Sequence, residues 1–220
     1  FVLVALLEFL DSTIKTWRDI ETRFGFKVLG VLPIIGEVKE RRTQEGPRKS
    51  RDLYVHEHPS SRIAEACRSL RTNLLFMGTV RPIRSLLITS ADPSEGKSTV
   101  AMCLAISLAS SGAKILLVEG DLRRPRMNDT LQLPPNTGLS HAVASEDRVT
   151  KHVQPSGIEN MDVLVSGAIP PNPGELLQTD RFKAILADCE ETYDMVIIDS
   201  PPVLPVADSL VLSTLVDGSL

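Results

Sequence analysis

The second half of the chain alternates between short apolar runs and longer segments with helical periodicity. Four of the runs have the length of buried strands: SLLITS (85–90), ILLVEG (115–120), MDVLVSG (161–167) and MVIIDS (195–200). The segments between them predict helices, one ending near Ser111 and another at about 179–192. Strands and helices in alternation predict an α/β domain with a mostly parallel sheet and helices on both faces.

The first residues follow a less regular pattern. Residues 1–24 predict a helix, with Asp11 and Ser12 as the alternative cap of a second helix, and residues 28–35 predict a short extended segment. The apolar run 1–7 either opens an amphipathic helix or is the end of a membrane helix. It lacks the basic start and small-residue cleavage site of a signal peptide. No stretch has the ~20 apolar residues of a complete membrane span.

A polar stretch separates this region from the strands. Residues 37–61 mix both charges, contain a glycine–proline break and show no apolar period, so they predict a linker or an exposed arm. Residues 62–77 then repeat apolar positions at helical spacing. They predict a helix, with Ser60 or Ser61 as its cap.

Composition narrows the class of protein. The 220 residues are 42% hydrophobic and 24% charged, which is typical of a folded soluble domain with a short appendage. The net charge of −4 argues against a dedicated nucleic-acid binder, since such proteins usually carry a basic excess. The three cysteines form no CxxC pair, and the four histidines show no zinc spacing with them. The absence of a GxSxG elbow gives acyl transfer no support.

A phosphate-binding loop is the clearest chemical signal. The segment ADPSEGKST (91–99) follows a predicted strand and opens a predicted helix, where backbone N–H groups and a helix N-terminus together attract a polyphosphate. Lys97 would reach the β- and γ-phosphates, and Ser98 would hold Mg²⁺. Ala91 stands where the usual pattern has glycine; the alternative is a chance GKST at a helix start. The expected nucleotide-binding residues are Asp92, Pro93, Ser94, Glu95, Gly96, Lys97, Ser98 and Thr99.

Acidic residues end two other predicted strands. Asp199 closes MVIID and, beside the phosphate loop, is expected to hold Mg²⁺ directly or through water. Glu119 and Asp121 follow ILLV, at the edge where ligands bind in open α/β sheets. One acid of this pair would bind the metal, and the other would take a proton from an attacking hydroxyl. Taken singly, these acids have alternatives: helix capping for Asp199 and a solvated turn for the pair.

In this order, the three motifs resemble the cytoplasmic domain of the bacterial tyrosine kinases of capsule and exopolysaccharide synthesis (BY-kinases). They correspond to the Walker A, Walker A′ and Walker B motifs of that family. The resemblance covers nearly the whole chain and implies a P-loop NTPase-like three-layer sandwich, truncated at its C-terminal end. Further matching segments are LLEFLDSTIK (6–15), VLGVLP (28–33), SGAIPPNPGELL (166–177) and VLPVADSLVL (203–212).

The resemblance also implies a function. The chain would be the ATP-dependent, non-receptor-type protein-tyrosine kinase domain of a regulator of polysaccharide chain length and export. It would pass the γ-phosphate of ATP to tyrosines of neighbouring subunits, with Mg²⁺. Lys97, Glu119, Asp121 and Asp199 would be catalytic, and Ser98, Asp121 and Asp199 would bind the metal. Glu119 stands where the family usually has the proton-accepting aspartate, and its extra methylene puts that role in doubt.

Partners and organisation follow from the same resemblance. Glu65, Arg68 and Arg71 match an ExxRxxR helix that packs one subunit against the next in a ring; the alternative is intrahelical Glu–Arg pairing on a solvated surface. Residues 1–36 would be a juxtamembrane segment after a truncated membrane helix, 37–61 a linker and 62–220 the kinase domain. The expected location is the cytoplasmic face of the bacterial inner membrane, next to the polysaccharide polymerisation and export machinery, with no nucleic-acid partner.

Two other functions remain open. One is a nucleotide-responsive scaffold of a polysaccharide exporter with little chemistry of its own, which Glu119 motivates. The other is a partitioning or cell-division ATPase of the same superfold, although its signature lysine is absent near Asp92. Tyr54 and Tyr193 do not match the family's tyrosine cluster, which is expected beyond Leu220 together with the adenine-binding residues. The residues VDGSL coincide with the start of another core strand in the family, so the sheet is expected to lack at least that strand.

Overall fold

A six-stranded sheet forms the centre of the chain in the computed structural model, which describes residues 13–14, 16–35, 51–79, 81–134 and 136–220. The strand order is β3-β4-β2-β5-β1-β6, and all neighbouring pairs are parallel except the antiparallel pair of β3 and β4. The strand bounds are β1 Ser85–Ile88, β2 Ile115–Glu119, β3 Gln154–Ile158, β4 Met161–Leu164, β5 Met195–Asp199 and β6 Gly218–Ser219.

The four strands expected from apolar runs are confirmed as β1, β2, β4 and β5. Every residue of β1, β2 and β5 is buried, as continuous apolar runs in a parallel sheet require. The two-residue β6 pairs with β1, so the expectation that the sheet lacks a strand at this position is corrected for its first residues. The edge strand β3, with the sequence QPSGI, was not predicted, because its proline and glycine are residues that weaken strand propensity.

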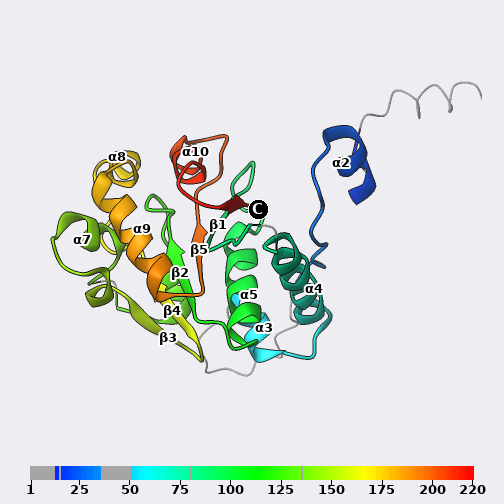
Figure 1. Ribbon diagram of the computed structural model, residues 1–220, viewed down its shortest axis with the longest axis horizontal. Coiled ribbons are helices and arrows are strands. Elements are labelled where there is room, and N and C mark those ends of the chain that lie inside the picture. The colour runs from blue at the N-terminus through cyan, green and yellow to red at the C-terminus, as the bar shows by residue number, and fades with distance from the viewer. Residues whose placement is uncertain (1–12, 15, 36–50, 80, 135) are drawn as a thin grey trace, which may run out of the picture.

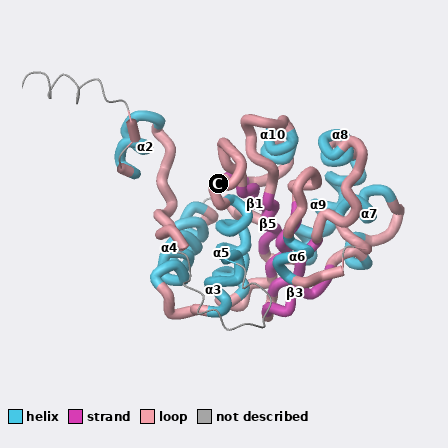
Figure 2. The backbone as a smooth tube through the Cα atoms, turned by 180° about the vertical axis from the view of Figure 1, so that it is seen from behind, coloured by secondary structure: helices cyan, strands magenta, loops and turns pink. Residues whose placement is uncertain are grey.

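Helices cover both faces of the sheet and give three layers, as Figures 1 and 2 show from opposite sides. Alternate strand residues point to opposite faces. Leu86 and Ile88 of β1 belong to the core under α4 and α5, whereas Leu87 belongs to the core under α7, α9 and α10. The helices are α2 Trp17–Phe24, α3 Tyr54–Glu57, α4 Arg62–Met77, α5 Lys97–Ala109, α6 Met127–Leu131, α7 Leu139–Ala144, α8 Pro173–Leu177, α9 Asp180–Thr192 and α10 Asp208–Ser213, with 3-10 turns η1 Arg51–Leu53 and η2 Val149–Lys151.

Three predicted helices agree closely with the structure. The helix expected at 62–77 is α4, and the Ser61 hydroxyl caps it by accepting the Ala64 N–H. The helix after the phosphate loop is α5, which ends shortly before the left-handed Gly112. The helix expected at about 179–192 is α9.

The N-terminal region is only partly described. Helix α2 confirms only the last part of the helix expected at 1–24, because the described residues before it, Thr13, Ile14 and Thr16, are not helical. Thr16 forms the capping box of α2 with Asp19. The apolar run 1–7 and the alternative cap at Asp11 and Ser12 lie outside the described residues. The segment 28–35 forms no strand, but its Leu29 carbonyl accepts a hydrogen bond from Asn73 of α4.

Residues 51–57 correct the prediction of a polar linker. They form η1 and α3, which pack against α5, and their side chains Asp52 and Val55 are buried. The prediction of an exposed arm is therefore wrong for this part of 37–61, while residues 36–50 lie outside the described residues. The error arose because the buried face of so short a helix needs one apolar residue and one paired acid, which leaves no periodic pattern.

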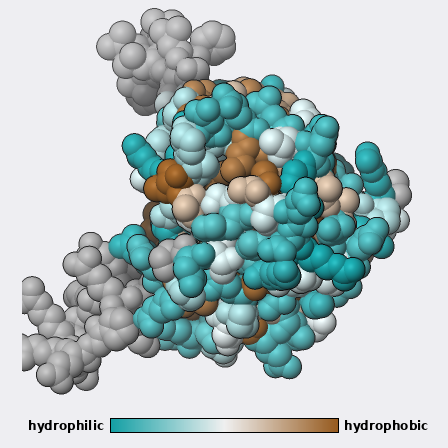
Figure 3. Space-filling view, turned by 90° about the vertical axis from the view of Figure 1, so that its left-hand side faces the viewer, coloured by the Kyte–Doolittle hydropathy of each residue, from teal (hydrophilic) through white to brown (hydrophobic). Residues whose placement is uncertain are grey.

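One face of the molecule is mainly polar. The face on the side of α7 and α8 is mostly hydrophilic and has a few apolar patches (Figure 3). Within the described residues, no helix combines the length and the apolar character that crossing a bilayer demands.

Candidate nucleotide-binding and phosphoryl-transfer site

The carboxyl ends of β1, β2 and β5 meet at one edge of the sheet. Asp199 stands opposite Ile88 on one side and Glu119 on the other in the strand register. A cleft of about 340 Å³ lies over this edge, lined by residues from 93–98, 119–126 and 199–206. The three sequence motifs, which are far apart along the chain, are therefore brought together as expected for ligand binding at the carboxyl edge of a parallel sheet.

The phosphate loop has the backbone that an anion site needs. Gly96 adopts φ +96, a left-handed conformation that side chains rarely tolerate, immediately before the first residue of α5. The Glu95 carboxylate accepts the Asp92 N–H at 3.0 Å and closes the loop. Lys97 begins α5, and its Nζ lies 3.6 Å from Asp121 Oδ2. A helix N-terminus and a cation thus face the same small volume.

Asp199 presents a buried carboxylate to the cleft. Asp199 is only 1% exposed, and its Oδ1 has no hydrogen-bond partner within the described part of the chain. Burial raises the pKa of Asp199 to about 6, against the opposing effects of the Ser98 hydroxyl hydrogen bond and the Lys97 and Arg126 charges. An unpartnered buried oxygen beside a hydroxyl is the donor set that Mg²⁺ prefers, so these residues fit that cation.

Asp121 is held in place by its own loop. Its Oδ1 accepts the backbone N–H groups of Arg123 at 3.3 Å and Arg124 at 3.1 Å, while Oδ2 faces Lys97. The side chain lines the cleft. Its orientation is therefore fixed by the short turn after β2, with one oxygen directed towards the phosphate-loop lysine.

Glu119 has a different environment from the one expected of a proton acceptor. Its Oε1 accepts the N–H groups of Arg126 at 2.5 Å and Met127 at 2.8 Å, and its Oε2 accepts the Ser166 N–H at 3.0 Å. The residue is 1% exposed. Both oxygens are therefore engaged with backbone amides, which argues against the predicted transfer of a proton and indicates that Glu119 ties the loops after β2 and β4 together.

Two ion pairs at the cleft were missed by sequence reasoning. Arg123 donates to both oxygens of Asp208 at the start of α10, from Nε at 2.7 Å and from Nη2 at 3.1 Å. Arg126 donates from Nη2 to both oxygens of Asp52, at 2.8 and 2.7 Å. The run of basic residues at 123–126 was a visible signal, but nothing local identified its partners.

The predicted oligomer contact is engaged within the chain. Glu65 and Arg68 pair along α4 at 2.5 Å, and Arg68 Nη1 also donates to the Pro59 carbonyl. Arg71 Nη1 donates to the Ser107 carbonyl of α5. The intrahelical pairing named as the alternative is thus present, and a contact between subunits stays a prediction.

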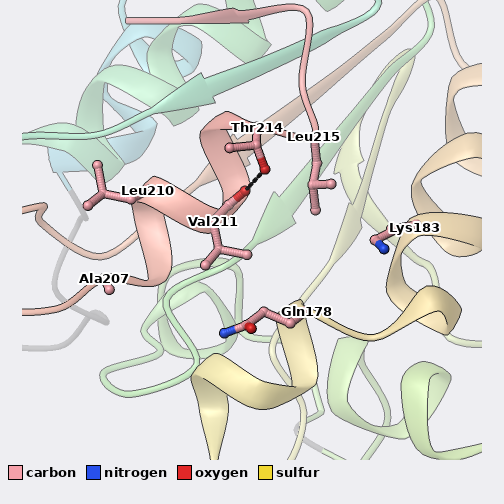
Figure 4. A pocket seen from close by; sticks show the side chains of 7 residues that line it. All are labelled: Gln178, Lys183, Ala207, Leu210, Val211, Thr214 and Leu215. Atoms are coloured by element: carbon pink, nitrogen blue, oxygen red, sulfur yellow. Dashed lines mark hydrogen bonds between the residues drawn. The ribbon is translucent and has the colours of Figure 1, made fainter.

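Other candidate sites are less suited to chemistry. Among the described residues, no group of three His, Cys, Asp or Glu side chains is placed to hold a metal. The three cysteines are free and buried. A second cavity of about 430 Å³ lies between α8, α9 and α10 (Figure 4), but the one titratable side chain among those lining it is Lys183, which pairs with Asp180 at 2.8 Å.

Known proteins of similar sequence and structure agree on one family. The AAA domain family matches residues 91–216. Tyrosine-protein kinase YwqD of Bacillus subtilis is 40% identical over 179 residues, 81% of this chain and 76% of that protein. Tyrosine-protein kinase etk of Escherichia coli K12 is 35% identical over 204 residues, which are 93% of this chain but 27% of that longer protein.

The architecture matches as well. The solved kinase domain of the Escherichia coli tyrosine kinase ETK superposes with a TM-score of 0.84 at 33% identity, covering 94% of this chain and 80% of that domain. The sheet order, the cleft and the resemblance of the motifs thus agree with a sequence match over most of the chain. The chain belongs to the bacterial tyrosine-protein kinase (BY-kinase) family.

Proposed function

We propose that the chain binds Mg·ATP in the cleft and transfers its γ-phosphate to a tyrosine hydroxyl, as a kinase domain acting in polysaccharide chain-length control and export. The observation that carries this proposal is the meeting of Lys97, Asp121 and Asp199 at one edge of the sheet, in a chain of the tyrosine kinase family. Phosphoryl transfer depends mainly on positioning and charge neutralisation, which such a site supplies.

Each residue has a separate task in this proposal. The loop 92–99 binds the polyphosphate through its backbone and the α5 N-terminus, and Lys97 neutralises charge on the terminal phosphates. Ser98 and Asp199 would hold Mg²⁺, and the bound cation would offset the charge that develops during transfer. The unpartnered Asp199 Oδ1 supports this assignment.

The proton acceptor is assigned to Asp121 in preference to Glu119. Asp121 Oδ2 has no backbone donor among the described residues and faces the cleft, whereas both Glu119 oxygens accept backbone N–H groups. A group that takes the tyrosine proton needs an oxygen within reach of that hydroxyl. Asp121→Asn is therefore expected to lower kcat by about a hundredfold or more, because this is the usual contribution of a general base.

The activity is tested by replacing the phosphate-loop lysine. Lys97→Met should abolish phosphotyrosine formation on a tyrosine-containing peptide, measured with radiolabelled ATP. Lys183→Met is the matched control, because Lys183 lies in the second cavity and pairs with Asp180 on the surface. Phosphorylation retained by Lys97→Met, or lost equally in Lys183→Met, contradicts the proposal.

A scaffold that responds to nucleotide is the second candidate function. It is favoured by the hydrogen bonds of Glu119, because the carboxylate at the family's proton-acceptor position is occupied by backbone N–H groups. A chain that binds Mg·ATP but phosphorylates no tyrosine peptide, in the parent and in Asp121→Asn alike, would support this function over the kinase.

Assembly and location are part of the same proposal. We infer that α4 contacts a neighbouring subunit in a ring, and that the chain acts at the cytoplasmic face of the inner membrane beside the polysaccharide machinery. Glu65 and Arg68 have side chains 68% and 41% exposed, so both are accessible to a neighbour. Reversing the charge of Glu65 with Glu65→Arg should lower the sedimentation coefficient of an assembled form, and an unchanged coefficient would contradict the ring contact.

We also propose a new N-terminal boundary for the kinase domain. The linker predicted over 37–61 is assigned to the kinase domain from residue 51 onwards, since η1 and α3 pack on α5. Proteolysis of the folded chain should therefore leave residues 51–61 attached to the domain.

A further inference from the structure

Asp52 is a buried acid that joins three segments around the cleft. The residue is 6% exposed and belongs to η1, in the part of the chain that precedes α4. Its Oδ1 accepts the Thr99 hydroxyl at 2.5 Å, and both of its oxygens accept Arg126 Nη2. Thr130 donates to Oδ2 at 3.4 Å. The carboxylate thus links η1 to the first turn of α5 and to the loop after β2.

The burial of this carboxylate indicates a specific role. An ionised acid taken out of water is costly unless it is paired and hydrogen-bonded. The contacts with Arg126 and Thr99 supply that compensation, and charge-assisted hydrogen bonds are stronger than neutral ones. Thr99 directly follows Ser98 in the phosphate loop. The position of Asp52 is therefore coupled to the part of α5 that faces the nucleotide.

Arg126 is held at both ends. Its backbone N–H donates to Glu119, and its guanidinium is fixed by Asp52. The side chain nevertheless remains 49% exposed and lines the cleft with Lys97 and Ser98. Its charge also reaches Asp199, whose pKa it lowers.

This arginine lines the cleft and keeps donors that a ligand there could use. Within the described part of the chain, every guanidinium hydrogen bond of Arg126 uses Nη2, which leaves Nη1 and Nε to donate elsewhere. Because both paired edges of a guanidinium include Nη2, Nη1 and Nε would each donate a single charge-assisted hydrogen bond to a phosphate oxygen. A fixed guanidinium loses less conformational entropy when it binds an anion than a mobile one does.

We propose that Asp52 is a positioning residue for the nucleotide site: it holds Arg126 at the mouth of the cleft so that the guanidinium binds phosphate oxygens of Mg·ATP. This inference rests on the proposed function. It makes nucleotide affinity depend on a segment that precedes the phosphate loop by some forty residues. The alternative is that Asp52 merely fastens η1 and α3 to α5.

Calorimetric titration of the chain with Mg·ATP separates the two roles. Asp52→Asn removes the charge that fixes Arg126 and should raise Kd about tenfold, which equals about 1.4 kcal/mol of binding free energy. Arg126→Ala should raise Kd to a similar extent. In the double variant, the second change should add little, because both act through one contact.

Val55→Ala is the matched control. Val55 lies in α3, is 6% exposed and packs in the core, so its truncation loosens the same segment without touching Arg126. It should lower the melting temperature and leave Kd for Mg·ATP unchanged. A Kd that rises in Val55→Ala as it does in Asp52→Asn would overturn the proposal, as would a Kd for Asp52→Asn within twofold of the parent.

Two further variants keep the test decisive. If Asp52→Asn does not fold, Arg126→Lys retains a cation opposite Asp52 but lacks the Nη1 and Nε donors, and it must raise Kd about tenfold; an unchanged Kd overturns the proposal. Lys97→Met examines the proposed function by itself. Parent-like binding in Lys97→Met contradicts nucleotide binding at this loop, whereas weak binding there with parent-like Asp52→Asn overturns only the positioning role.

Discussion

Shortening Glu119 to aspartate is expected to destabilise the folded chain without improving catalysis. The Glu119 carboxylate accepts three backbone N–H groups, from Arg126, Met127 and Ser166. Met127 and Ser166 are 2% and 0% exposed, so water cannot replace the lost partner. Aspartate withdraws the carboxylate by about 1.5 Å, the length of one C–C bond.

The magnitude follows from the number of donors left without a partner. A buried donor without an acceptor costs about 1–3 kcal/mol. Aspartate at position 119 cannot reach both the amides after β2 and the Ser166 amide after β4 at once, because these lie on separate loops. We therefore expect Glu119→Asp to lower the free energy of unfolding by about 3 kcal/mol, the sum of one or two such losses.

Urea denaturation followed by circular dichroism measures this change. Glu146→Asp is the control for the same chemical substitution, since Glu146 is exposed, and it should alter stability by less than about 0.5 kcal/mol. Phosphotransfer to a tyrosine peptide, measured below the melting temperature, should not rise in Glu119→Asp. A variant as stable as the parent would refute the assignment of Glu119 to loop anchoring, and a large gain in phosphotransfer would show that its length limits proton transfer.

Three other changes have predictable outcomes. Burial raises the pKa of Asp199 from 3.8 to about 6, so the folded chain binds this proton more tightly than the unfolded chain. The ionised carboxylate therefore lowers the stability of the fold above about pH 6, and this destabilisation is lost as the pH falls towards 4. Asp199→Asn should therefore stabilise the magnesium-free chain by about 3 kcal/mol at pH 8 and by much less at pH 4. Urea denaturation measures this, and an equal gain in the free energy of unfolding at both pH values would contradict it. Gly138→Ala should destabilise by about 3 kcal/mol, because a Cβ there would lie 2.3 Å from the Val165 carbonyl oxygen; an unchanged melting temperature would argue against that contact. Tyr193→Phe removes the 2.8 Å hydrogen bond to Asp162 and should cost about 1 kcal/mol, with no change in kinase activity if Tyr193 is not a phosphorylation target.

The strands and the phosphate loop were predictable because their signals are local. The run MVII (195–198) has no polar residue to place on a solvent face, and the position of Asp199 directly after it follows from the same run. Gly96 and Lys97 were predictable because a tight turn before a helix restricts the residue types that fit. These features depend on neighbours a few residues away.

The partners of buried charges were not predictable in this way. Asp52 lies 47 residues from Thr99 and 74 from Arg126 along the chain, and its short helix shows no apolar period. Glu119 stands in a motif that favours catalysis, yet the amide after β4 decides where its carboxylate points. Long-range contacts of this kind depend on how loops from separate strands meet at the sheet edge.

The sequence by itself determined the α/β class, the parallel direction of the buried strands and the position of the phosphate loop between a strand and a helix, because strand burial and loop chemistry are encoded in consecutive positions. The tertiary structure alone decided which acids remain available in the cleft. Asp121 and Asp199 keep an oxygen without a backbone donor among the described residues, whereas Glu119 and Asp52 use theirs to hold the surrounding loops. That division depends on which backbone N–H groups and guanidinium groups lie within hydrogen-bonding distance once the chain is folded.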